Sequence, residues 1–234
     1  YGIACRSLGR AIHSPDMLSA QILIPAAIVH LGYHKTATTW LQKQLFPRAL
    51  SHEFIPRKTV QQAFLAPPGM HFDADEARRL LALENRNRPV LLSEENLSGY
   101  LHNGGLHGFV APEMARRLHQ VLPEARIVVF IRNQLDISRA SYAQYVSGGG
   151  TWGPRRYFAA AGKVRGALTR PWKAPMFEFE HFEFDRLITL YDGLFGRQQV
   201  HVYPYEWLRD RDALVARMER DLGLAVDPAG ASER

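Results

Sequence analysis

Three short apolar runs, each separated from the next by a helical pattern, constrain the fold of this chain most strongly. They cover residues 26–31, 89–93 and 126–131, and their length and composition are typical of buried strands. Residues 199–203 alternate between apolar and polar side chains, as a further strand does. Strands that alternate with helices favour right-handed crossovers. The sequence therefore predicts an α/β fold with a central parallel β-sheet flanked by helices.

The helical segments are expected where apolar residues recur at helical spacing beside a stop signal. Pro47, Pro123, Gly196 and Gly223 each follow such a segment, and Pro112 suits the first turn of another. Residues 147–150, Ser-Gly-Gly-Gly, indicate a loop. The expected helices cover residues 36–46, 73–85, 112–122, the segment after the third apolar run up to about residue 146, 184–195 and 212–222.

Ligands of open parallel sheets bind beyond the carboxyl ends of the strands. Three segments of this chain lie there, namely residues 32–39, 93–97 and 132–141. Each is rich in charged or hydroxyl side chains and follows one of the apolar runs directly. We therefore look for the functional site in these three segments.

The first segment, Gly32-Tyr-His-Lys-Thr-Ala-Thr-Thr-Trp40, is suited to an anionic group. It leads from a strand into a helix, where free backbone N–H groups and the helix dipole favour negative charge. Lys35 adds a positive charge, and Thr36, Thr38 and Thr39 add hydroxyl donors. The segment is not a Walker A loop, because no glycine precedes Lys35 directly. The alternative is that the threonines only cap the helix.

Residues 33–40 resemble the 5′-phosphosulfate loop of sulfotransferases that use 3′-phosphoadenosine 5′-phosphosulfate (PAPS), whose usual form is Tyr-Pro-Lys-Ser-Gly-Thr-Thr-Trp. Ala37 stands where that loop has glycine, which lets the backbone approach the phosphate closely. The resemblance implies that Lys35 contacts the leaving phosphate oxygen. It also implies that Thr38 and Thr39 bind the 5′-phosphate and that Trp40 stacks on adenine. On periodicity alone, Trp40 is equally a core residue.

The third segment begins with Arg132, which leaves a buried strand at the expected ligand edge. A guanidinium can bind a phosphate there through two hydrogen bonds, and the alternatives are an ion pair with Asp136 or a helix cap. Arg132-Asn-Gln-Leu-Asp-Ile-Ser-Arg-Ala-Ser-Tyr142 resembles the 3′-phosphate motif of the same family. The serine of that motif falls on Ala140 here. We expect Ser141, the next residue, to supply the hydroxyl.

The second segment, Ser93-Glu-Glu-Asn-Leu97, offers a general base for a hydroxyl acceptor. Glu95 is our choice, because similar sulfotransferases often carry Ser-x-Glu at this point. Glu94 is then expected to face away or to pair with an arginine. A glutamate that only stabilises a helix start is the alternative. His34, beside Lys35, is the rival base, because histidine titrates near neutral pH.

The resemblance covers about residues 27–224 and is to bacterial members of the family. It implies sulfuryl transfer from PAPS to an acceptor hydroxyl, such as that of a carbohydrate, lipid or small alcohol. We assign residues 27–224 to the sulfotransferase domain, residues 1–26 to an N-terminal extension, and residues 225–234 to a C-terminal end where such proteins often continue. Two alternatives stay open: a phosphotransferase with a degenerate phosphate loop, and a non-catalytic nucleotide-binding protein.

Composition excludes several classes of protein but does not indicate a particular function. The net charge of +6 suits an anionic partner or simple solubility, and the basic residues form no stripe typical of nucleic-acid binding. Cys5 is the only cysteine, which excludes a disulfide framework and a Cys-rich zinc site and favours the cytoplasm. His102, His107 and His181 do not stand at metal-ligand spacing from another histidine, so we predict no metal. The apolar run at 22–31 is too short to span a bilayer. The oligomeric state is not predicted.

Overall fold

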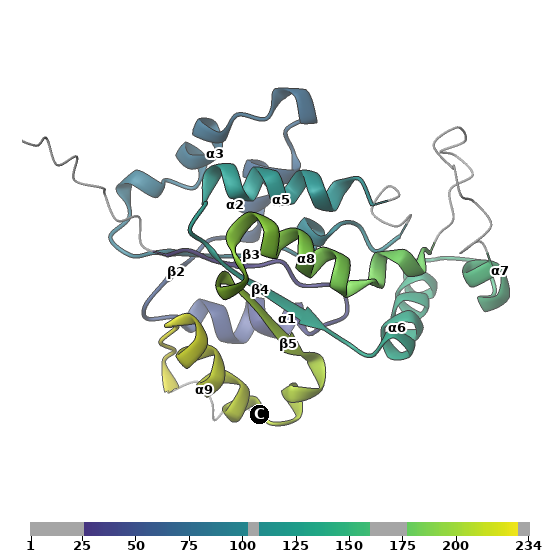
Figure 1. The fold of residues 1–234 in the computed structure, drawn as a ribbon. Coiled ribbons are helices and arrows are strands. Elements are labelled where there is room, and N and C mark those ends of the chain that lie inside the picture. The colour runs from purple at the N-terminus through teal and green to yellow at the C-terminus, as the bar shows by residue number, and fades with distance from the viewer. Residues whose placement is uncertain (1–25, 103–107, 160–176, 229–234) are drawn as a thin grey trace, which may run out of the picture.

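A computed structural model describes residues 26–102, 108–159 and 177–228 of the chain, so that Cys5 and most of the N-terminal extension lie outside the described residues. Its centre is a five-stranded, all-parallel sheet in the order β2-β3-β1-β4-β5 (Figure 1). The predicted α/β fold with a central parallel sheet is therefore confirmed. The strands are β1 (Ile28–His30), β2 (Glu53–Phe54), β3 (Val90–Ser93), β4 (Arg126–Ile131) and β5 (Val200–Pro204).

Helices cover both faces of this sheet. Two hydrophobic clusters, one on each face, hold the layers together. The larger cluster includes Val29, Phe64 and Leu118, and the smaller one includes Ile28, Leu41 and Met218. Because Ile28 and Val29 are neighbours in β1 and point to opposite faces, this single strand contributes to both.

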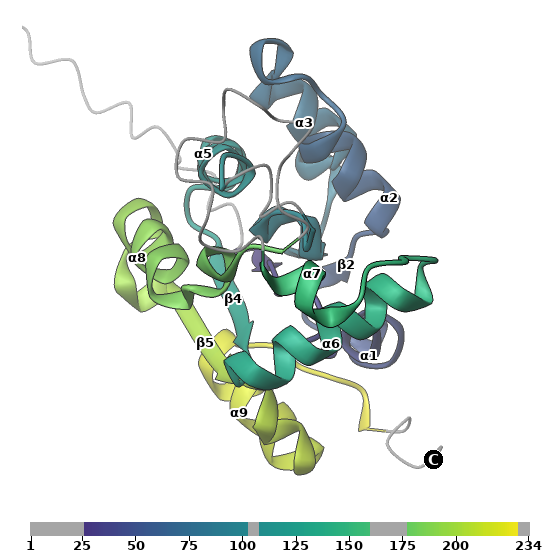
Figure 2. The same cartoon turned by 90° about the vertical axis from the view of Figure 1, so that its right-hand side faces the viewer.

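The helices are α1 (Thr38–Trp40), α2 (Arg57–Val60), α3 (Ala74–Leu80), α5 (Val110–Val121), α6 (Gln134–Ser147), α7 (Pro154–Ala159), α8 (Phe184–Phe195) and α9 (Arg211–Leu222). Figure 1 shows α2, α3, α5 and α8 above the sheet and α1 and α9 below it, and Figure 2 turns α6 and α7 toward the viewer. The predicted helices ending at Val121, Phe195 and Leu222 agree with the structure to within two residues at each end.

The predicted helix 73–85 is wrong beyond Leu80. Asp73 caps its start, as its carboxylate accepts from the backbone N–H groups of Asp75 and Glu76. At the other end Ala82 adopts a left-handed conformation with φ of 52°, and a 3-10 turn follows at Leu83–Asn85. The Arg86 guanidinium donates to the Leu81 carbonyl at 2.7 Å. This side-chain cap lets the helix end without glycine or proline.

The predicted helix 36–46 also has different ends. It starts at Thr38, because Lys35 and Ala37 both have positive φ and cannot belong to a right-handed helix. It continues as a π-helical segment at Leu41–Leu45 and a 3-10 turn at Phe46–Arg48. Pro47 lies at the start of that turn, where its missing N–H group is not needed, and so the helical segment continues past it.

The sequence reasoning missed the segment between Glu53 and Leu65. It holds the edge strand β2 and the helix α2, which continues as a π-helical segment at Gln61–Leu65. A signal was present, because Pro56 precedes the helix and Val60, Ala63 and Phe64 are buried at helical spacing. This helix matters for the site, since it brings Arg57 and Gln61 under the end of β3.

Candidate active site

The loop after β1 lies at the carboxyl edge of the sheet, between the ends of β3 and β4. Gly32 has φ of 50°, and a Cβ there would lie 2.7 Å from the His30 ring and 3.0 Å from the Thr38 hydroxyl. Only glycine fits this close approach. Lys35 and Ala37 follow with φ of 66° and 64°. The loop is therefore held in a conformation that its side chains do not favour.

The hydroxyl groups of this loop take different roles. Thr36 is fully buried, and its hydroxyl donates to the Tyr33 carbonyl, so it closes the turn instead of facing a ligand. The Thr38 hydroxyl is buried and has no hydrogen-bond partner in the described part of the chain. Thr39 and Lys35 are exposed. Of the three threonines expected to meet a phosphate, Thr38 and Thr39 keep a hydroxyl that is not already bonded to the loop.

Replacing Ala37 with Gly should raise the free energy of unfolding by roughly 0.5–1 kcal/mol. The left-handed conformation costs alanine about 1–2 kcal/mol, and the greater freedom of glycine in the unfolded chain offsets part of the gain. Chemical denaturation measures the change. Ala82→Gly is the matched control, because Ala82 has φ of 52° outside the site and should gain a similar amount. A loss of stability in Ala37→Gly alone would show that the Ala37 methyl group packs favourably.

Arg132 leaves the end of β4 and reaches the phosphate loop. Its guanidinium donates from Nη1 to the Lys35 carbonyl oxygen at 2.9 Å, although the two residues are 97 positions apart. One predicted alternative, an ion pair with Asp136, is not formed in the described structure, where Asp136 lies 3.9 Å from Arg139. Asn133 caps α6 by accepting from the backbone N–H of Leu135 at 3.0 Å. The two predicted motifs therefore meet in space.

Ser141, which we expect to supply a hydroxyl to the 3′-phosphate, lies on the buried side of α6. Its side chain is fully buried, and its hydroxyl donates to the Ile137 carbonyl one turn earlier in α6, at 2.7 Å. Ser138 is bonded in the same way to the Gln134 carbonyl at 2.6 Å. Both serines face their own helix because α6 packs this side against the core. The Ser141 hydroxyl is therefore already bonded within α6.

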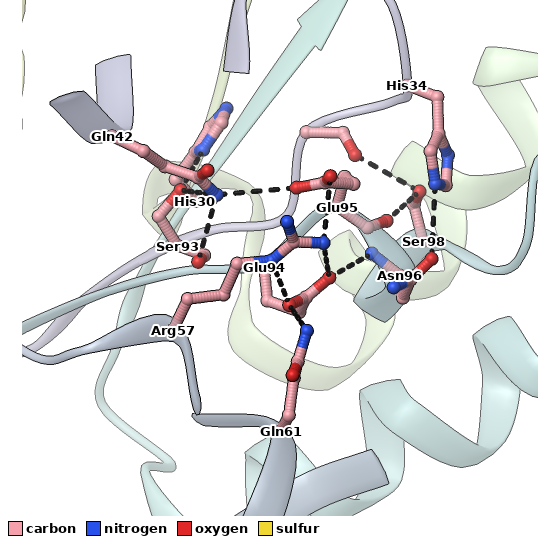
Figure 3. A network of polar contacts seen from close by, with 11 residues as sticks. His30, His34, Gln42, Arg57, Gln61, Ser93, Glu94, Glu95, Asn96 and Ser98 are labelled. Atoms are coloured by element: carbon pink, nitrogen blue, oxygen red, sulfur yellow. Dashed lines mark hydrogen bonds and ion pairs between the residues drawn. The ribbon is translucent and has the colours of Figure 1, made fainter. Parts of the chain in front are cut away.

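Glu94 and Glu95 follow β3 and are joined by one arginine (Figure 3). Glu94 is fully buried and accepts from Arg57 Nε at 2.6 Å, from Gln61 at 2.7 Å and from the backbone N–H of Asn96 at 2.9 Å. Glu95 lies 2.9 Å from Arg57 Nη2, and 17% of its side chain stays exposed. Glu94 thus pairs with an arginine, which is one of the two outcomes expected for it, and it also caps the following helical turn. Glu95 shares the same arginine and is the more accessible carboxylate.

Glu94→Gln should lower the free energy of unfolding by about 1.5–3 kcal/mol. The amide keeps the shape of the side chain but removes the negative charge that holds two bonds from Arg57, and bonds to charged groups are worth about that much. The Arg57 side chain is 41% exposed, so water replaces part of the loss. Urea unfolding of this variant and of Glu76→Gln makes the comparison. Glu76 pairs with Arg79 on the surface, so Glu76→Gln should lower the free energy of unfolding much less.

His34 lies beside the carboxylates and is the second candidate base. Its Nε2 is 3.1 Å from the Asn96 side-chain oxygen, so Nε2 carries the hydrogen and Nδ1 is the basic atom. Burial lowers the pKa of His34, against the opposing effect of the Glu95 carboxylate. Nδ1 is buried without a partner among the described residues. Burial therefore favours the neutral form of His34, and Asn96 orients the ring.

His30, Ser93 and Gln42 are parts of the site that the sequence reasoning missed. His30 Nδ1 lies 2.8 Å from the Ser93 hydroxyl, and Gln42 Nε2 lies 3.1 Å from that hydroxyl and 3.3 Å from Glu95. Burial lowers the pKa of His30 to about 3, so it is uncharged at neutral pH. Figure 3 shows these side chains in one chain of contacts that ends at Glu95. Gln42 thereby holds one oxygen of the Glu95 carboxylate.

Two cavities flank the phosphate loop. One, of about 420 Å³, is lined by residues after β1, β4 and β5, among them Trp40, Arg132 and Tyr205. Trp40 also packs against the smaller core cluster, so both predicted roles of this tryptophan are compatible. The other, of about 430 Å³, is lined by Tyr33 and Ser98 and by apolar side chains of α8. Ser98 donates to the Gly32 carbonyl at 3.1 Å, which ties this second cavity to the loop.

The described residues form neither a metal-binding cluster nor a membrane-spanning helix. In residues 26–102, 108–159 and 177–228, no three His, Cys, Asp or Glu side chains gather as a metal site would require. In the same ranges, no helix has the length and apolar character needed to cross a membrane.

Two solved structures share this fold. A sulfotransferase from Alicyclobacillus acidocaldarius matches with a TM-score of 0.61 and 19% identity, over 89% of this chain and 86% of that one. The sulfotransferase domain from the curacin biosynthetic pathway matches with a TM-score of 0.51 and 11% identity, over 87% and 76% of the two chains. No protein-family model matches the chain, and no curated protein does. At these identities the likeness concerns the fold, which is the P-loop-like α/β fold of sulfotransferases.

Proposed function

We propose that this protein is a sulfotransferase that moves the sulfuryl group of PAPS to an acceptor hydroxyl and releases 3′,5′-bisphosphoadenosine (PAP). One observation carries the proposal: the Arg132 guanidinium contacts the Lys35 loop. Two motifs that resemble the two phosphate-binding motifs of one family thus lie together at the ligand edge of a sheet with that family's fold. If the two resemblances were due to chance, there would be no reason for the two segments to be in contact.

The order of the strands supports a division of the site into two sides. The Lys35 loop follows β1, which lies between β3 and β4. On the β4 and β5 side, Trp40, Arg132 and Tyr205 line the cavity of about 420 Å³, which we assign to the nucleotide. On the β3 side stands Glu95, which we assign to the acceptor. The phosphosulfate group then lies over the loop, between the two substrates.

The proposed reaction is an in-line displacement at sulfur. The acceptor oxygen forms a bond to sulfur as the bond from sulfur to the phosphate oxygen breaks, and the hydroxyl proton passes to Glu95. Lys35 stabilises the negative charge that grows on the departing phosphate, with Thr38 and Thr39 on the 5′-phosphate. Positioning and electrostatic stabilisation supply most of the rate in such a site. No metal takes part in this proposal.

The acceptor is expected in the cavity of about 430 Å³ beside Tyr33. Pro112, Leu187 and Leu190 give it apolar walls, and glutamates line its other side. An apolar lining with a few polar groups is typical of sites for small organic ligands. We therefore favour an acceptor with an apolar body, which a lipid or a small-molecule alcohol has and a highly charged carbohydrate lacks.

A thermal-shift titration with PAP, ATP plus Mg²⁺, and 5′-AMP tests the proposal. A ligand at about 100 times its dissociation constant should add about 2.7 kcal/mol to stability. Selective stabilisation by PAP supports the donor site and justifies a screen of acceptors for PAP release from PAPS. Preference for ATP would instead favour a phosphotransferase with a degenerate loop. PAP binding without turnover on any acceptor would favour a non-catalytic nucleotide-binding protein.

A further inference from the structure

The cavity assigned to the nucleotide contains more positive charge than the two family motifs supply. Besides Arg132 it is lined by Arg209, from the connection between β5 and α9, and by Arg211, the first residue of α9. Neither of these arginines belongs to a segment that suggested nucleotide binding in the sequence. Trp40 and Tyr205 form the aromatic part of the same lining.

Two of these arginines lie over aromatic rings. The guanidinium carbon of Arg132 is 4.3 Å from the centre of the Tyr205 ring, and that of Arg211 is 5.2 Å from the centre of the Trp40 ring. Stacking of this kind holds a guanidinium flat while its N–H groups stay free to donate. It therefore orients Arg132 and Arg211 without using the groups that would bind an anion.

The carboxylates of the cavity do not neutralise these arginines. Glu206 is 3.3 Å from the backbone N–H of Asn133, and Asp136 lies 3.9 Å from Arg139, which is outside the lining. Within the described ranges, none of the three lining arginines forms an ion pair with a carboxylate. Three guanidinium groups against two carboxylates leave the cavity with a net charge of +1. Such a lining favours an anionic ligand.

We infer that Arg209 and Arg211 bind a phosphate group of the nucleotide that is separate from the 5′-phosphosulfate. The inference rests on the proposed function, because the 5′ group is assigned to the Lys35 loop that Arg132 already contacts. Of the two residues expected at this second phosphate, Arg132 lines the cavity, whereas the Ser141 hydroxyl is bonded inside α6. Arg209 and Arg211 add further donors beside Arg132. A nucleotide with phosphates at both the 3′ and the 5′ position satisfies both groups of donors. A nucleotide whose phosphates are all attached at the 5′ position would reach only the donors of the Lys35 loop.

The test compares dissociation constants for PAP, ADP and 5′-AMP by calorimetry in the wild type, Arg211→Ala and Arg209→Ala/Arg211→Ala. PAP and ADP carry the same number of phosphates in different places, so they separate position from charge. We expect Arg211→Ala to weaken PAP roughly 10-fold to 100-fold and the double variant to weaken it further. ADP and 5′-AMP should change by less than about 3-fold, because loss of one charge acts on them only at long range.

Arg217→Ala is the matched control. Arg217 is on the same helix and lies over Trp207 at 4.5 Å, but it does not line this cavity. It should leave all three dissociation constants unchanged. Equal losses for PAP and 5′-AMP in Arg211→Ala, or no loss for PAP, would overturn the assignment while the sulfotransferase proposal stands. A wild type that binds PAP no better than ADP would overturn the proposed function itself and this inference with it.

Discussion

Replacing Glu95 with Gln is expected to lower the rate of sulfuryl transfer about 10²-fold to 10⁴-fold, while the affinity for PAP stays nearly unchanged. The amide keeps the size of the side chain but cannot accept the acceptor's proton. Gln42 and Arg57 hold the carboxylate at 3.3 Å and 2.9 Å, so its position is fixed before any substrate arrives. Initial rates of PAP release with an identified acceptor, beside calorimetric titration of PAP, separate turnover from binding.

The outcome for His34 decides which residue is the base. His34→Gln should cost little beyond a loss of local order, because the Asn96 contact holds its Nε2 and its basic Nδ1 is buried. Thermal unfolding of both variants checks that each is folded at the assay temperature. If His34→Gln were nearly inactive and Glu95→Gln fully active, the proton would pass to His34 and our assignment of Glu95 would be wrong.

The fold was predictable because its signals are local and redundant. β4 covers residues 126–131 as predicted, since a continuous apolar run after Pro123 leaves few other choices. The helix α8 covers residues 184–195 as predicted, and Gly196 follows it with φ of 85°. In both cases a periodic pattern and a terminating residue agree.

Element ends without a turn residue could not be predicted in the same way. Ala37 and Ala82 adopt left-handed conformations that alanine does not favour. Nothing in an alanine signals such a turn, so residues 36–46 and 73–85 were expected to be regular helices. Side-chain contacts formed in the folded chain stabilise these turns, namely the Arg86 donor on the Leu81 carbonyl and the Arg132 donor on the Lys35 carbonyl. Contacts of this kind have no local pattern.

The site residues divide in the same way: those that belong to a motif were predictable, and those whose surroundings depend on packing were not. Lys35 and Arg132 were found from motifs, and the structure brings their segments together. The burial of Ser141 could not be predicted, because the face that α6 buries depends on its neighbours and not on its own sequence. Arg57 and Gln61, four residues apart on one helical face, were missed because their helix was missed. Glu94 and Glu95 were distinguished by resemblance alone, and their burial now gives a physical reason for the choice.

Lys35→Ala is expected to lower the rate of sulfuryl transfer at least about 10²-fold and to weaken PAP as well. The ammonium group is the positive charge of the loop on which the departing phosphate is expected to lie. Its loss removes stabilisation that grows as the bond to sulfur breaks, so the rate should fall more than the affinity does. Single-turnover rates with bound PAPS, measured beside the dissociation constant of PAP, report the two effects separately.

The backbone conformation at Lys35 allows alanine without a change in backbone strain. Lys35 has φ of 66°, and alanine meets the same penalty there, so the stability of the loop should not change. Lys43→Ala is the control, because Lys43 is exposed on the π-helical segment that follows the loop and carries the same charge. It should keep full activity. Equal losses in both variants would mean that the enzyme responds only to its total charge, and Lys35 would then have no special place beside the leaving group.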